Sequence, residues 1–191
     1  MTREEMVGAA CALINRCRTG SAMVIAIDGG GGAGKSTLAR GIENAFAGSV
    51  SIIRCDDFYG PLHDTQLAPA EAYENYFDWR RMRDAAMMPL RAGRRARYQR
   101  SDWTRDHLAQ WIDAEPREIV VIEGVFATRP ELRGLIDLAI FIETPREERI
   151  RRMTARPQDS LAWMDLWLAA EDWYLENVAP HRSADLLLKG F

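Results

Sequence analysis

The stretch VIAIDGGGGAGKSTLA, residues 24–39, joins an apolar run to four consecutive glycines and a Gly-Lys-Ser-Thr. Residues 29–36 satisfy the pattern G-x-x-x-x-G-K-[ST], in which glycines let successive backbone N–H groups surround phosphate oxygens. The apolar run 22–28 predicts a strand and residues 35–47 predict a helix, which is the context that this pattern requires. The sequence therefore predicts a binding site for a nucleoside triphosphate.

The loop contains more glycine than the pattern needs. Gly29 is required, whereas Gly30 to Gly32 occupy variable positions, and we expect them to leave the phosphate-facing side of the loop bare. Lys35 would reach the β- and γ-phosphates, and the Ser36 hydroxyl would ligate Mg²⁺. The predicted nucleotide-binding residues of the loop are Gly29, Gly30, Gly31, Gly32, Ala33, Gly34, Lys35, Ser36 and Thr37.

Length and composition limit the class of protein. A chain of 191 residues with 47% apolar residues is long enough for one core, so we expect a single domain over 1–191. Its net charge of −3 provides no general attraction to nucleic acid. The three cysteines lack CxxC spacing, and no run approaches the ~18 apolar residues that span a bilayer. We expect a cytoplasmic protein that binds neither nucleic acid nor membrane, and the sequence leaves its oligomeric state open.

The remaining apolar runs predict the architecture. With helices between them, they predict a three-layer α/β domain with a five-stranded parallel sheet. Thr2 followed by Glu5 predicts a capped helix over 2–18, and residues 57–117 predict a helical and irregular insertion that binds the acceptor. The predicted strands after the first are 49–55, 118–124, 138–144 and 184–190.

Acidic residues follow two of these strands. Asp56 and Asp57 come after the second, and Glu123 ends the third. Ligands of open α/β sheets bind at the carboxyl ends of the strands, and phosphoryl transfer to an alcohol needs a carboxylate that accepts the hydroxyl proton. We predict Asp56 and Lys35 as catalytic residues and Ser36, Glu123 and Asp56 as the Mg²⁺ site. A solvated turn is the alternative for the two aspartates.

An arginine-rich segment over 146–160 follows the fourth strand. Arg149, Arg152 and Arg156 have the i, i+3, i+7 spacing of one helical face. We predict a lid in which Arg149 and Arg152 stabilise charge on the transferring phosphoryl group and Arg156 binds the nucleotide. The alternative is a salt-bridged surface formed with Glu147 and Glu148.

The next predicted helix, 160–178, carries a stripe of large side chains. Trp163, Trp167, Ala170 and Tyr174 fall on one helical face. Such a stripe most often faces a core, so we expect this helix to pack against the sheet.

Together these segments resemble the uridine kinase-like branch of the P-loop kinases. Besides the glycine loop, the resemblance includes R-x-x-R-x-x-x-R at 149–156, and it runs in the expected order from about residue 20. It implies a sheet in the order 2-3-1-4-5 and an ATP- and Mg²⁺-dependent kinase. The other matching stretches are DDFY (56–59), YFDW (76–79), IEGVFA (122–127) and ADLLL (184–188).

The resemblance also implies roles in acceptor binding. Asp56 is similar to the family's catalytic base, Tyr59 to an aromatic of the acceptor site and Asp78 to the aspartate that holds ribose hydroxyls. Glu123 matches the Mg²⁺-associated glutamate, and the lid arginines match those that close over the ATP phosphates. The predicted acceptor-binding residues are Asp57, Tyr59, Asp78, Trp79, Arg81 and Tyr98.

The acceptor segments depart from the family's pattern. Trp79-Arg80 replaces the family's His-Pro, and Ser101-Asp102-Trp103 stands where the family has Tyr-Asp-Phe. A nucleoside such as uridine or cytidine is the expected acceptor. One alternative is an anionic metabolite, such as a sugar acid or a pantothenate-like compound, and another is an ATP-binding regulatory module without an acceptor. Arginines that would suit an anionic acceptor are Arg80, Arg81, Arg83, Arg97 and Arg100.

Overall fold

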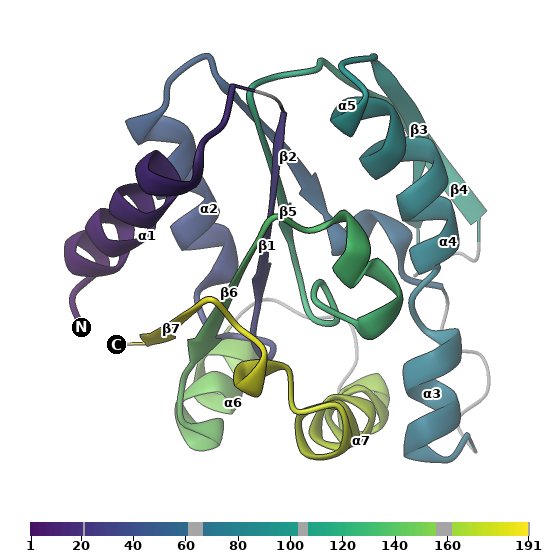
Figure 1. Ribbon diagram of the computed structural model, residues 1–191. Coiled ribbons are helices and arrows are strands. Elements are labelled where there is room, and N and C mark those ends of the chain that lie inside the picture. The colour runs from purple at the N-terminus through teal and green to yellow at the C-terminus, as the bar shows by residue number, and fades with distance from the viewer. Residues whose placement is uncertain (21, 61–66, 103–106, 156–161, 191) are drawn as a thin grey trace.

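A computed structural model describes residues 1–20, 22–60, 67–102, 107–155 and 162–190. A five-stranded parallel sheet lies at its centre in the order β2-β5-β1-β6-β7 (Figure 1). Counted among the strands of this sheet alone, the order is the predicted 2-3-1-4-5. The strands are β1 (Met23–Asp28), β2 (Val50–Arg54), β5 (Ile119–Glu123), β6 (Leu138–Glu143) and β7 (Leu186–Lys189).

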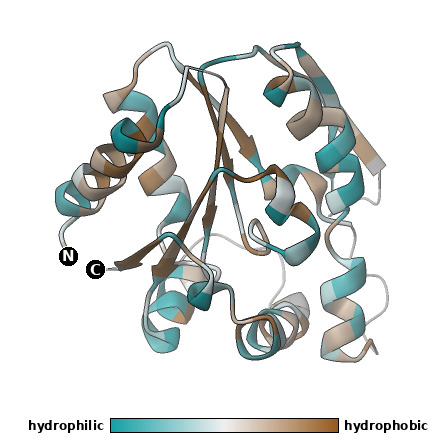
Figure 2. Ribbon diagram, in the orientation of Figure 1, coloured by the Kyte–Doolittle hydropathy of each residue, from teal (hydrophilic) through white to brown (hydrophobic). Residues whose placement is uncertain are grey.

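Helices cover both faces of the sheet, which confirms the predicted three-layer architecture. The central strands β1 and β5 are buried at every position, as their continuous apolar runs predict, and Figure 2 shows the sheet as predominantly hydrophobic. Ile25 and Ile27 pack with α1 (Arg3–Cys17) and α2 (Lys35–Ala45). Val24 and Ala26 point to the opposite face, where they share a core with residues of α3 (Pro69–Asn75) and α7 (Ala162–Asn177).

Local signals in the sequence account for the helix ends and faces. The Thr2 backbone N–H donates to Glu5 Oε2 at 2.8 Å and the Glu5 N–H donates to Thr2 Oγ1 at 3.2 Å, so the predicted capping box is confirmed. Trp167, Ala170 and Tyr174 of α7 are buried as predicted, whereas the side chain of Trp163 lies outside the described residues.

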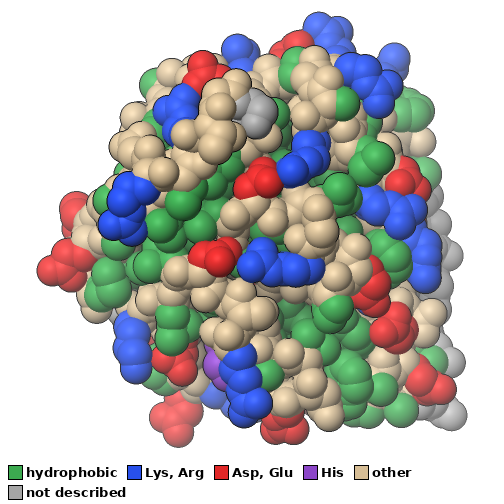
Figure 3. Space-filling model, in the orientation of Figure 1, with side chains coloured by type: hydrophobic (Ala, Val, Ile, Leu, Met, Phe, Trp, Pro, Cys, Tyr) green, Lys and Arg blue, Asp and Glu red, His purple; other side chains and the backbone are tan. Residues whose placement is uncertain are grey.

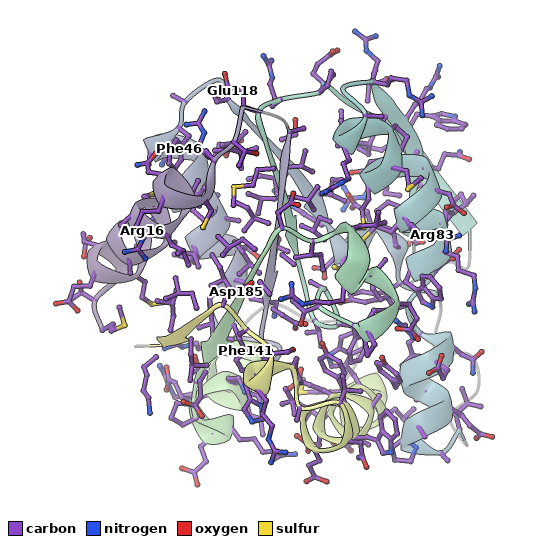
Figure 4. The ribbon with its side chains drawn as sticks, viewed as in Figure 1. Arg16, Phe46, Arg83, Glu118, Phe141 and Asp185 are labelled. Carbon is purple, nitrogen blue, oxygen red and sulfur yellow. The ribbon has the colours of Figure 1, made fainter. Side chains whose placement is uncertain are left out.

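The C-terminal strand β7 forms one edge of the sheet. Asp185, labelled in Figure 4, accepts the backbone N–H of Ala139 at 2.8 Å and thereby joins the start of β7 to β6. The short 3₁₀ helix η3 (Pro130–Leu135) lies between β5 and β6, and η4 (Pro180–Arg182) lies between α7 and β7.

On the face shown in Figure 3, acidic and basic side chains are interspersed. Among the described helices, none has the length and apolar character needed to cross a bilayer.

The insertion between β2 and β5 is more regular than predicted. It begins with the 3₁₀ helix η1 (Cys55–Phe58) and α3, and it ends with an antiparallel pair, β3 (Ala96–Asp102) and β4 (His107–Ala114). The prediction of a helical and irregular insertion missed this hairpin. Ala96 and Tyr98 are buried while Arg97 is exposed, so buried and exposed side chains alternate along the start of β3. Because most residues of β3 are polar, the sequence does not show the alternation of apolar and polar residues that predicts a strand. Between them, α4 (Trp79–Met82), the π-helical η2 (Arg83–Met87) and α5 (Met88–Arg91) run consecutively.

Two helical glycines provide a matched test of the packing between α1 and α2. A Cβ at Gly41 would clash with Val7 of α1, whereas a Cβ at Gly8 would meet nothing within 4 Å. We expect Gly8→Ala to raise the free energy of unfolding by about 0.5–1 kcal/mol through helix propensity, and Gly41→Ala to lower it by about 1–3 kcal/mol through overpacking. Urea denaturation measures both, and a stabilised Gly41→Ala protein would contradict the close contact.

Candidate active site

The glycine loop lies between β1 and α2 at the carboxyl edge of the sheet (Figure 1). Gly29 and Gly34 have φ angles of 142° and 102°, which residues other than glycine rarely adopt. Helix α2 begins at Lys35, so its N-terminal N–H groups and partial positive charge lie at the loop. Buried Lys35 donates from Nζ to the carbonyl oxygens of Gly29 at 2.7 Å and Gly30 at 2.8 Å. The loop thus holds the Lys35 ammonium group, a cation that can bind a phosphate group.

Two oxygen donors meet beside this loop. Ser36 Oγ donates to Glu123 Oε2 at 3.1 Å, and Glu123 is 5% exposed at the end of β5. Mg²⁺ prefers oxygen ligands and often takes one or two from protein while phosphates supply others. Ser36 and Glu123 fit this donor set. In the described ranges, no three His, Cys, Asp or Glu side chains cluster as an all-protein metal site.

The register of β2 and β5 places Asp56 near Glu123, because Arg54 pairs with Glu123 and Asp56 follows Arg54 by two residues. Burial raises the pKa of Glu123, the nearby Lys35 ammonium lowers it, and the Asp56 carboxylate raises it further. Asp56 is exposed in η1, directly after β2, which pairs with β5. The strand ends therefore bring together Lys35, Ser36, Asp56 and Glu123, and their catalytic and Mg²⁺-binding roles stay predictions.

Asp57 faces the hairpin and not the solvent. It is 6% exposed, and its carboxylate accepts from Tyr98 Oη at 3.4 Å and pairs with Arg100 Nε at 3.2 Å. Burial raises the pKa of Asp57, and the Arg100 guanidinium opposes this rise. The predicted acceptor-binding residues Asp57 and Tyr98 thus join η1 to β3.

Asp78 and Arg81 lie beside η1 because two chain segments run together. Asp78 N–H donates to the Phe58 carbonyl at 2.9 Å. Asp78 caps α4 by accepting the Arg81 N–H at 3.0 Å and also accepts from Arg81 Nε at 3.2 Å. Arg81 further donates to the Gln99 carbonyl at 2.5 Å and to Ser101 Oγ at 2.8 Å. Arg81 also donates to the Asp57 carbonyl at 3.3 Å and so connects α4, η1 and β3. The Asp78 side chain stays 51% exposed.

The predicted acceptor aromatics Tyr59 and Trp79, like Tyr98, lie in the core. Tyr59 donates from Oη to the Val125 carbonyl at 2.9 Å and packs edge-on against Trp167, and burial raises its pKa well above the usual range. Trp79 is 7% exposed and has the Arg80 and Arg129 guanidinium groups over its ring.

The predicted lid arginines have different environments on α6 (Arg146–Thr154). Arg149 is buried and forms an ion pair with Glu171 of α7. Arg152 pairs with Glu148 at 2.6 Å, as the salt-bridged alternative expects, and also donates to the Gly32 carbonyl of the glycine loop at 3.3 Å. Arg156 lies outside the described residues.

Sequence reasoning gave no role to a fully buried carboxylate at the start of the loop. Asp28 Oδ1 accepts the Gly29 N–H at 2.6 Å, and Oδ2 accepts from the Thr128 N–H at 2.8 Å and from Tyr174 Oη at 2.7 Å. The signal that could have found it is an acidic residue closing an otherwise apolar strand. Arg129, also fully buried and paired with Glu131 at 2.8 Å, has no comparable signal.

The parallel sheet with a glycine loop leading into a helix defines a P-loop nucleotide-binding protein. The sequence model of the Phosphoribulokinase / Uridine kinase family matches residues 24–189. The chain belongs to this family.

Individual relatives agree with this assignment. A uridine kinase of Halobacterium salinarum is 32% identical over 139 residues, 69% of this chain and 61% of the relative, so the match spans less than two thirds of that protein. A uridine kinase of Chlamydia pneumoniae is 29% identical over 176 residues, 83% of this chain and 73% of the relative. The structure of a possible uridine kinase from Bacillus stearothermophilus has a TM-score of 0.78 at 23% identity, covering 98% of this chain and all of the other; this likeness supports the fold.

The raised pKa of Glu123 predicts opposite effects on stability and on Mg²⁺ binding. When a carboxyl group has a higher pKa in the folded state, the folded protein becomes less stable as the pH rises through that pKa. The buried charge of Glu123 therefore lowers the free energy of unfolding at neutral pH. We expect Glu123→Gln to raise Tm at pH 7.5 by roughly 2–4 °C, the response to about 1 kcal/mol, and to weaken Mg²⁺-dependent nucleotide binding. The gain in Tm should shrink as the pH falls toward 5.

Calorimetry over this pH range and titration of Mg²⁺ measure the two effects. Glu43→Gln, at an exposed position of α2, is the control and should change neither. A Glu123→Gln protein that is less stable than the parent at pH 7.5 would contradict the desolvation argument.

Proposed function

We propose that this protein is an ATP- and Mg²⁺-dependent kinase that transfers the γ-phosphoryl group to a hydroxyl of a nucleoside such as uridine or cytidine. The observation that carries the proposal is the meeting of Asp56 with Lys35, Ser36 and Glu123 at the carboxyl ends of β1, β2 and β5. A site that only held a nucleotide would not need an exposed carboxylate beside the phosphate loop. The family membership and the uridine kinases among its relatives support the same reaction.

In this mechanism the chain's own residues orient the reactants and move one proton. The acceptor oxygen attacks the γ-phosphorus in line, the bond to the β–γ bridging oxygen breaks, and Asp56 accepts the hydroxyl proton while ADP leaves. Lys35 and the helix N-terminus at the loop stabilise phosphate charge. Mg²⁺, held by Ser36 and Glu123, would neutralise phosphate oxygens when bound.

The charge distribution favours an uncharged acceptor. An anionic acceptor would need guanidinium groups that are not already neutralised. Four of the five arginines considered for that role are paired with carboxylates, and Arg83, labelled in Figure 4, lies at the outer edge of the molecule in that view. The pairs are Arg81 with Asp78 at 3.2 Å, Arg83 with Asp84 at 2.7 Å, Arg97 with Asp113 at 3.9 Å and Arg100 with Asp57 at 3.2 Å.

Asp78 provides the acceptor contact that a nucleoside would use. Its carboxylate is half exposed and is fixed near Asp56 by the pairing of residues 58–60 with 76–78. Although both oxygens accept from Arg81, each carboxylate oxygen has two acceptor positions, so the exposed side can still receive ribose hydroxyls. We infer that Asp57, Tyr59 and Tyr98 shape this region from behind, because their polar groups are engaged within the protein.

Substitution of Asp56 tests the proposed base. We expect Asp56→Asn to reduce kcat for uridine phosphorylation by about 10²–10⁴-fold, the usual contribution of a general base, while the Kd for Mg·ATP changes less than threefold. Lys35→Ala should weaken ATP binding and turnover together. Coupled ADP-release assays and ATP titration measure these quantities, with Asp113→Asn on the exposed hairpin strand as the control.

The same assays separate the alternatives. Turnover of sugar acids or pantothenate-like compounds without turnover of uridine or cytidine would establish an anionic acceptor. ATP binding with no acceleration by any acceptor would instead favour a regulatory module, and full activity of Asp56→Asn would remove Asp56 from its role.

A further inference from the structure

A second carboxylate, Glu171 of α7, is buried against the middle of the glycine loop. Glu171 is 0% exposed. Its Oε2 accepts the backbone N–H of Gly31 at 2.6 Å, and its Oε1 accepts from Arg149 Nη1. Arg149 also donates from Nη1 to the Gly31 carbonyl at 3.4 Å. One loop residue therefore has both its backbone groups bonded to a buried ion pair from α6 and α7.

The three variable glycines, Gly30 to Gly32, leave the space that the Arg149–Glu171 ion pair and its helices occupy. A Cβ at Gly30 would clash with the Arg149 guanidinium and lie 2.6 Å from Glu171 Oε1. A Cβ at Gly31 would lie 2.8 Å from Met153 Sδ, and one at Gly32 would lie 2.5 Å from the Arg149 carbonyl oxygen. Side chains at these three positions would push α6 and α7 away from the loop.

Burial makes the arrangement sensitive to the loss of either partner. A carboxylate removed from water needs a nearby cation and hydrogen-bond donors, and Arg149 and the Gly31 N–H supply them. Helix α7 is fixed at a second point, because Tyr174, three residues after Glu171, donates to Asp28 at the start of the loop. The two contacts together hold the loop segment 28–31 from one helix.

We propose that Glu171 is a positioning residue for the nucleotide loop and that Arg149 acts on the loop through Glu171 and not directly on the phosphate. Glu171 holds the Gly31 amide and Arg149 holds the Gly31 carbonyl, so the loop is ordered before the nucleotide binds. Nucleotide binding then does not have to supply the free energy that orders the loop. The consequence for nucleotide affinity rests on the proposed function, whereas the order of the empty loop does not.

Amide hydrogen exchange of the nucleotide-free protein tests the order of the loop directly. In the parent protein we expect the Gly31 N–H to exchange at least 100-fold more slowly than an unstructured amide. Glu171→Gln should speed this exchange at least tenfold and leave the Leu38 amide in α2 unchanged. Glu176→Gln, at an exposed position of the same helix, should match the parent. An unprotected Gly31 amide in the parent overturns the proposal even if no variant folds.

A double-mutant cycle tests the role of Arg149. We expect Glu171→Met to raise the Kd for Mg·ATP about tenfold, and addition of Arg149→Met to raise it by no more than a further twofold, because both residues act through one contact. The double variant replaces the buried ion pair with apolar side chains. If Glu171→Met alone does not fold, the double variant is compared with the parent directly, and a Kd raised by more than about twentyfold overturns the proposal. A further tenfold loss on adding Arg149→Met would overturn the proposal by placing Arg149 on the phosphate. Absence of ATP binding in the parent would instead refute the proposed function, while the Gly31 exchange rate would still decide this inference.

Discussion

The rest of the site depends on the buried carboxylate of Asp28, at the end of the central strand. It accepts hydrogen bonds from the loop at Gly29, from the backbone N–H and hydroxyl of Thr128 and from Tyr174 of α7. A carboxylate in a low-dielectric interior is tolerated only with such donors. Because the donors come from the loop, from the segment after β5 and from α7, the requirement to satisfy one group fixes the relative positions of three elements.

This constraint explains why so much glycine is compatible with an ordered loop. Glycine loses more conformational freedom on folding than any other residue, so a bare loop would be costly to order. Here the loop is packed from outside by α6 and α7, and the absence of Cβ atoms lets Arg149 and Met153 approach its backbone closely. The expectation that the extra glycines keep the phosphate-facing side bare overlooked this packing, which acts at Gly30 and Gly31 through lack of space and at Gly32 also through a φ of 78°.

Whether a structural feature can be predicted from the sequence depends on how far apart in the chain its interacting residues lie. The five strands of the parallel sheet, the capped first helix and the loop depend on residues close in the chain, and all were predicted. The buried ion pair and the hydrogen bond from the Gly31 N–H to Glu171 join residues 22 and 140 positions apart, so no local pattern could specify them. One local sign was available, because Glu171 lies on the same helical face as Trp167, Ala170 and Tyr174. A charged residue within a core-facing stripe must find a buried partner.

The two halves of the site are held by different physical means. The phosphate half is fixed through backbone groups of a loop that joins a central strand to a helix. Within the part of the chain that the structure describes, the side chains that hold this loop include Asp28, Arg149 and Glu171 and none from the hairpin. The proposed acceptor half depends on long side chains: Arg81 bonds to β3 backbone and side-chain oxygens, and Asp57 is joined to Tyr98 and Arg100. Changing one such side chain can shift the hairpin relative to Asp56 without disturbing the loop. Acceptor choice can therefore differ between proteins that share one phosphate site, which is why the loop identifies the P-loop class while the acceptor has to be argued from the pairing of individual charges.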